Sequence, residues 1–148
     1  MKLIITDNNT LQPRLNTLKT LSQTTVQVGL PANASPHLKF ILLIQEHGSP
    51  VNNIPPRPVI QPALSRPEIR QQMAESMRDA LHAAWHGNDP RPSLEEAGQA
   101  GADSLRAYID SHIPPPNRPS TVARKGFDLP LYDTGALYRA FSYEVTPK

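Results

Sequence analysis

Two histidines have the spacing of metal ligands on a helix. His82 and His86 are four residues apart, and a helix places such residues on one face. Helical zinc-protease motifs carry a glutamate directly after the first histidine, where this chain has Ala83. With Glu75 or Asp79 as a further ligand, the pair would fit a small metal-dependent hydrolase. A pair of surface histidines is the favoured interpretation, and we expect neither a metal nor another cofactor.

Other catalytic patterns are missing from the sequence. The chain has no cysteine, which excludes disulfides, thiol catalysis and cysteine-based zinc sites. No serine lies in a Gly-x-Ser-x-Gly elbow. Gly98 and Gly101 fall inside a predicted helix with no strand before it, so they do not form a phosphate-binding loop. Helix capping explains the adjacent carboxylates Glu95 and Glu96. We therefore predict that the protein is not an enzyme.

The composition indicates one domain, over residues 1–148, with a modest aliphatic core. Apolar residues make up 38% of the chain and aromatic residues 5%, and the formal net charge is +2. Basic residues are spread along the chain rather than clustered, which disfavours a DNA-binding regulator. No stretch approaches the ~18 consecutive apolar residues of a membrane span. Residues 1–7 lack the apolar core of a signal peptide.

Apolar periodicity predicts an α+β fold, in which a small antiparallel sheet packs with three to four helices. Residues 24–30 alternate between apolar and polar types, as in a half-buried strand. Long helices are predicted to start at Pro67, and at Ser93 through a capping box. Two further elements are predicted in the first half, an edge strand over 2–6 and a helix from Thr10 to Ser22. Residues 37–46 fit a helix or a strand, and a helix that stops at Gly48 is favoured. Later elements are an extended stretch over 128–132, a turn or the cap of a single helical turn over 133–135, and a closing strand from Tyr138.

Small residues crowd the first half of the helix predicted after Ser93. Alanine and glycine account for residues 97, 98, 100, 101 and 102. Such a surface lets a second backbone approach closely. That backbone could belong to the same chain or to a neighbouring subunit.

Proline-rich loops connect the predicted elements near residues 46–66 and 114–130. Seventeen residues of the chain are proline. The segment Ile54-Pro55-Pro56-Arg57-Pro58 should be stiff and extended, because proline fixes φ and restrains the residue before it. It is either a docking device that holds Arg57 in place or an ordinary loop.

The second connector is polar and basic. Residues 117–127 have no periodicity, which predicts a mobile surface loop. Arg118, Arg124 and Lys125 in this loop are candidates for non-specific contact with DNA.

Two short motifs, taken in order, resemble the signature of a family of small phage morphogenesis proteins. The first is Glu46-His47-Gly48 followed by Ile54-Pro55-Pro56-Arg57-Pro58. The second is Lys125-Gly126, Pro130-Leu131 and Asp133-Thr134-Gly135-Ala136-Leu137. The combination is similar to the tail-completion or neck proteins of long-tailed bacteriophages and prophages, including lambda-type tail-completion and Mu-type virion-morphogenesis proteins. The chain departs from the family at His47, where phenylalanine is common, and at Val59, where an aromatic residue is usual.

The resemblance implies a structural virion protein that completes the head-proximal end of the tail and helps to join head and tail. Such proteins are expected to form a homo-oligomeric ring in the neck, assembled in the host cytoplasm, with no membrane partner. The implied partners are other neck and tail proteins, namely the tail terminator, the head-closure or connector proteins and the tail tube. A tail terminator or a head-closure connector is the alternative function.

Overall fold

A long helical hairpin and a two-stranded ribbon form the body of the molecule. The computed structural model of the chain describes residues 8–147, with the side chains of residues 11–147. The predicted α+β class with a small antiparallel sheet is confirmed. The elements in chain order are α1 (Asn8–Ser22), β1 (Thr24–Gly29), α2 (Pro36–His47), α3 (Ile60–Leu64), α4 (Pro67–Trp85), α5 (Arg91–Asp110), α6 (Pro119–Lys125), α7 (Ala136–Ala140) and β2 (Ser142–Pro147).

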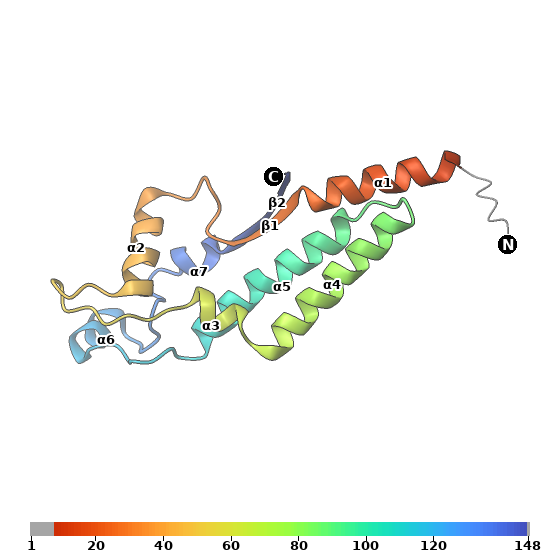
Figure 1. The fold of residues 1–148 in the computed structure, drawn as a ribbon. Helices are drawn as coiled ribbons and strands as arrows, with labels where there is room; N and C mark the ends of the chain where they lie inside the picture. Colours follow the sequence, from red (N-terminus) through yellow and green to blue (C-terminus); the bar gives the residue numbers. More distant parts are fainter. Residues whose placement is uncertain (1–7, 148) are drawn as a thin grey trace.

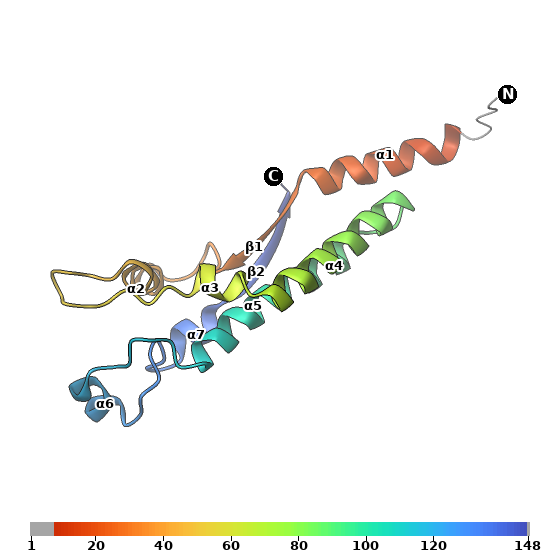
Figure 2. The same ribbon diagram turned by 60° about the horizontal axis from the view of Figure 1, so that its bottom comes forward.

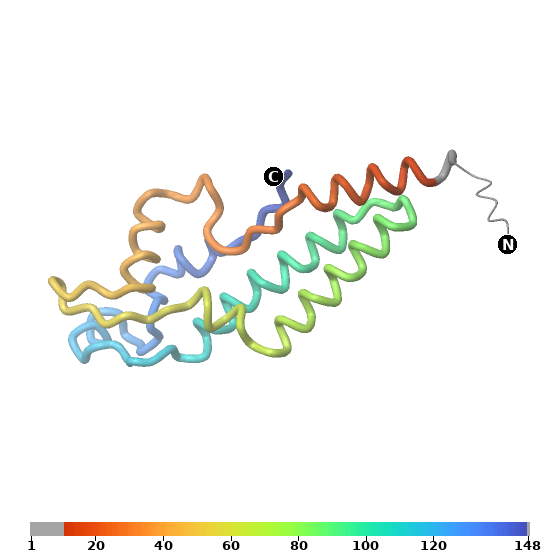
Figure 3. The backbone as a smooth tube through the Cα atoms, in the orientation of Figure 1, coloured from red at the N-terminus to blue at the C-terminus, as the bar shows by residue number. Residues whose placement is uncertain are grey.

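The elements are arranged along one long axis. Helices α4 and α5 run side by side as a hairpin, α1 lies beside α4, and the ribbon of β1 and β2 lies along α5 (Figure 1). The four elements α2, α3, α6 and α7 gather at the other end, as the backbone trace in Figure 3 also shows. None of the helices within residues 8–147 has the length and apolar character needed to cross a bilayer.

The two helices of the hairpin start at residues suited to that position. Pro67 is the first residue of α4, where its missing N–H costs nothing. Helix α5 starts at Arg91, whose N–H donates to Asp89 Oδ1 at 2.9 Å. The capping box predicted at Ser93 is therefore wrong. Asp89 supplies a side-chain acceptor further upstream, so Ser93 lies inside the helix.

The small residues of α5 make close contact within the chain. In the antiparallel ribbon, Val28 lies opposite Tyr143. A Cβ on Gly101 would lie 2.9 Å from Val28 Cγ2, and one on Gly98 would lie 2.5 Å from Tyr143 Cδ2. Only glycine lets the helix approach the ribbon this closely. The backbone that approaches the small residues of α5 in this structure is therefore the ribbon of the same chain.

The core joins α5 to the helices at the far end of the molecule. Phe141 and Leu105 are its largest fully buried side chains. Ser104 Oγ donates to the carbonyl of Ala63 at 2.8 Å, and Arg106 donates to the carbonyl of Phe141. The buried cluster consists of Val59, Ala63, Leu105, Ile109, Ile113, Leu137 and Phe141.

Two short helices lie where the sequence predicted loops, and a third, α7, follows the residues expected to form a turn or to cap a single helical turn. Helices α3 and α6 occupy the two proline-rich connectors, so the loop expected over 117–127 is corrected. The closing strand starts at Ser142 rather than Tyr138, because α7 occupies residues 136–140. The extended stretch expected over 128–132 is a turn, with φ of 63° at Leu131 and a bond from Tyr132 N to Leu129 O. The strand predicted over residues 2–6 and the side chain of Thr10 lie outside the described part.

Replacing Gly98 with alanine should destabilise the protein, although alanine favours a helix by about 1 kcal/mol over glycine. The added Cβ would lie 2.9 Å from the Cβ of Tyr143, so the strand as well as the ring must move. Overpacking of this kind costs about 1–3 kcal/mol. Urea denaturation should show a lower midpoint with an unchanged slope. In a Tyr143→Ala background the contacts with the ring are gone and only the Cβ of residue 143 remains close, so the same substitution should cost less. Equal losses in both backgrounds would contradict the proposed contact.

Candidate functional site

The proline-rich part of the connector after α2, residues 55–60, is tied to that helix at each of its backbone donors. From residue 55 to residue 60 three residues are proline and have no N–H. Of the remaining donors, Arg57 N bonds Gln45 O at 2.6 Å. Val59 N and Ile60 N both donate to Glu46 Oε1, at 2.7 and 2.9 Å. One carboxylate therefore fixes the start of α3 to the end of α2.

Gly48 makes the reversal between α2 and the connector. Its φ is 74°, and its N–H donates to Ile44 O at 2.7 Å. A Cβ at this position would lie 2.9 Å from both Ile54 O and Pro56 N. The loop from Ser49 to Ile54 is closed by two backbone hydrogen bonds of 2.9 Å between these two residues. Glycine is required here by both the positive φ and the close approach.

The side chain of Arg57 extends from the first connector to the second. It is only 7% exposed, and its Nε and Nη2 donate to the carbonyls of Pro115 and Pro116 at 2.8 and 3.1 Å. Burial lowers the pKa of Arg57, while the nearby charge of Asp128 raises it. Because an arginine remains protonated over the physiological range, the guanidinium keeps both bonds. Arg57 acts within the chain in this structure.

The second part of the signature forms the turn into α7. Gly135 has a φ of 75°, and a Cβ there would lie 2.8 Å from the hydroxyl of Tyr132. Thr134 Oγ1 accepts from Ala136 N at 3.3 Å, and Arg139 donates to Thr134 O at 3.1 Å. Asp133 lies 3.4 Å from Arg124. The turn places Leu137 in the buried cluster.

The two parts of the signature meet through the core. Val59, which follows the first motif, and Leu137, which ends the second, belong to one buried cluster. The hydrogen bonds of Glu46 and Arg57 join α2, α3 and the second connector around that cluster, and we call these two residues with their bonds the brace. The chemistry of the brace is hydrogen bonding to main-chain groups.

The three basic residues proposed to face DNA are bonded to their own chain. Arg118 Nη2 donates to Asn53 O at 2.7 Å, and Arg124 pairs with Asp133. Lys125 Nζ donates to Leu129 O at 2.8 Å and lies 4.9 Å from the ring centroid of Phe127. Burial lowers the pKa of Lys125. These bonds hold α6 against the connectors.

The histidine pair is arranged as its spacing predicted. The Nε2 atoms of His82, in the last turn of α4, and His86, the residue after the helix, are 3.1 Å apart. Glu75 Oε1, one candidate third ligand, accepts from Gln71 Nε2 at 2.9 Å. Within residues 8–147 there is no group of three or more potential metal ligands.

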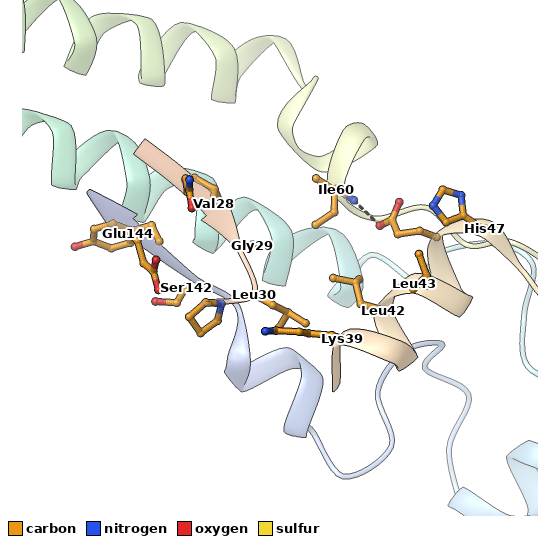
Figure 4. Close-up of a pocket in the computed structure, with 14 residues that line it drawn as sticks. Val28, Gly29, Leu30, Lys39, Leu42, Leu43, His47, Ile60, Ser142 and Glu144 are labelled. Carbon is orange, nitrogen blue, oxygen red and sulfur yellow. Dashed lines mark hydrogen bonds between the residues drawn. The ribbon is translucent and has the colours of Figure 1, made fainter. Parts of the chain in front are cut away.

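Two surfaces that the sequence did not reveal carry exposed apolar side chains. On α2 no residue is buried, and Phe40 and Leu43 are 59% and 56% exposed. Beside them lies a cavity of about 450 Å³ between α2 and the end of the ribbon (Figure 4). We call this the α2 surface. The α1–α4 surface consists of exposed Leu11, Leu15, Met77, Leu81 and Trp85. The continuous apolar run of α2 was the available signal for the first surface.

Comparison of the chain with protein-family models, with curated proteins and with solved structures finds no match.

Replacing Glu46 with alanine should lower the free energy of unfolding by about 2–4 kcal/mol, because two partly buried N–H groups lose their acceptor. Glu46→Gln keeps one acceptor oxygen and should cost less. Chemical denaturation followed by circular dichroism measures both. Glu75→Ala, at an exposed carboxylate of α4, is the matched control and should change stability by less than about 0.5 kcal/mol. A Glu46→Ala protein as stable as this control would rule out the brace.

Proposed function

We propose that this chain is a structural protein of a tailed phage or prophage virion, located in the neck. It would complete the head-proximal end of the tail and help to join head and tail as a ring. The observation that carries the proposal is the brace. The signature residues Glu46 and Arg57, on which the family resemblance depends, bond main-chain groups and set the shape of the α2 end of the molecule.

The two exposed apolar surfaces support assembly into a ring. The α2 surface and the α1–α4 surface lie at opposite ends of the long axis in Figures 1 and 2. They differ in composition and shape, so a contact that covers both joins unlike faces of neighbouring copies. Head-to-tail contacts of this kind generate closed rings when the rotation between copies closes.

Partners of the ring would be the tail terminator, the head-closure or connector proteins and the tail tube. Contact with DNA in the channel would be non-specific. Arg118, Arg124 and Lys125 contribute positive charge there, although each is already bonded within its own chain. Their proposed role is therefore electrostatic rather than base-reading. A gene position between those for head closure and tail termination would favour tail completion over the neighbouring connector roles.

Deleting the gene from an inducible phage should leave filled heads and separate tails that do not join. Complementation with the intact chain should restore joined particles, and electron microscopy of their necks should show a ring of copies. Normally joined, infectious particles without the gene would overturn the proposal.

Complementation with Arg57→Ala should fail or fall strongly, because the second connector loses both bonds from the guanidinium. Arg78→Ala, at an exposed position of α4, is the control and should complement fully. Particle titre and micrographs of the lysate measure both. Equal titres for the two variants would show that assembly of the particle does not depend on the brace.

A further inference from the structure

The cavity on the α2 surface has the dimensions and lining of a peptide-binding site. Its volume of about 450 Å³ lies within the ~300–1,000 Å³ of typical ligand pockets. Leu30, just after β1, faces Leu42, Leu43 and Ile60 across it (Figure 4). Val28 also contributes to the lining, while its side chain packs against Gly101 of α5. The apolar walls would bury aliphatic side chains from a partner.

Two polar side chains of the cavity are held by hydrogen bonds to the main chain. Lys39 Nζ donates to Ala32 O at 2.6 Å, and Glu144 Oε1 accepts from Ala32 N at 3.3 Å. Glu46 and His47 complete the polar part of the lining. The cavity therefore offers both a cationic and an anionic group to the ends of an incoming segment.

The ribbon beside the cavity consists of two strands. Among residues 8–147 the sheet consists of β1 and β2 alone, so each strand has one edge without a strand partner. Isolated two-stranded ribbons are marginally stable, and open edges readily pair with an extended segment. An occupant of β-forming sequence would stabilise the ribbon as well as fill the cavity.

We propose that residues 2–6 of a second copy, Lys2-Leu3-Ile4-Ile5-Thr6, occupy this cavity. The segment has three consecutive aliphatic residues for the apolar walls. Lys2 at one end and Asp7 beyond the other complement the acidic and basic groups of the lining. Isoleucine and threonine favour the extended conformation that pairing with a strand edge needs.

The cavity is beyond the reach of the same chain's segment. Helix α1 and strand β1 follow one another away from Asn8 in roughly the same direction, and the cavity lies at the far end of β1 (Figure 2). The 15 residues of α1 and six of β1 together extend about 40 Å. Residues 3–7 before Asn8 span at most about 18 Å. The occupant must therefore come from another copy, which gives a head-to-tail contact.

This inference rests on the ring of the proposed function and specifies its subunit contact. The cysteine-free chain allows a direct test with purified protein. Two single-cysteine variants, Ile4→Cys and Leu43→Cys, are mixed and oxidised, and disulfide-linked dimers are quantified on non-reducing gels. Docking raises the effective concentration of the two thiols, so the mixed dimer should exceed that from a control mixture of Ile4→Cys and Ala74→Cys by about tenfold or more.

Two outcomes would overturn the contact. One is a mixed dimer no more abundant than the control at any concentration. The other is a predominance of dimers that link two copies of the same variant. Circular dichroism of each variant verifies folding, and adding Ile5→Asp to the Ile4→Cys chain should abolish the excess. If a ring is seen in the neck but this cross-link does not form, the contact of residues 2–6 with the cavity is refuted and the proposed function is not. If the cross-link forms but the protein is absent from the neck of the particles, the proposed function is refuted and the contact is not.

Discussion

A single carboxylate that accepts two backbone N–H groups determines how the far end of this molecule is built. Helix α2 has no fully buried residue, and its packing on the core comes from the partly buried Leu38, Ile41 and Leu42. Its position therefore also depends on the bonds of its last turn to the proline-rich connector, through Glu46 Oε1 and Gln45 O. Between residues 55 and 60 the connector has only three N–H groups, and each of them donates to α2. Leaving such donors unpaired costs about 1–3 kcal/mol each, a large fraction of the stability of a small domain.

The body of the molecule is held by a different interaction. There the glycines of α5 allow the ribbon to approach until Val28 and Tyr143 contact the helix backbone region. Close packing of this kind tolerates little change in volume. Arg57 couples the two regions, because its guanidinium bonds the carbonyls that follow α5 while its main chain bonds α2.

The sequence predicted the long elements and few of their contacts. Periodicity was sufficient for α4 and α5, and Gly48 correctly marked the end of α2, because these signals are local. The short helices α3 and α6 were missed, since five to seven residues beside prolines show too little periodicity. The signature identified Glu46 and Arg57, but the partners of the Arg57 side chain lie 58 and 59 residues away and no local pattern points to them. Ser93 was misassigned because two acceptable capping residues lay close together.

A helix held by hydrogen bonds at one end, rather than buried along its length, is mechanically compliant. Leu38, Ile41 and Leu42 of α2 pack against the core cluster but are only partly buried, so a small tilt of α2 about its last turn shifts these contacts without emptying a fully buried site. The α4–α5 hairpin cannot tilt against the ribbon in this way, because its glycine contacts leave no slack. The α4–α5 hairpin and the ribbon thus form a rigid unit, to which α2 is attached through its last turn. This arrangement can absorb a mismatch in angle between neighbouring copies while keeping their spacing fixed.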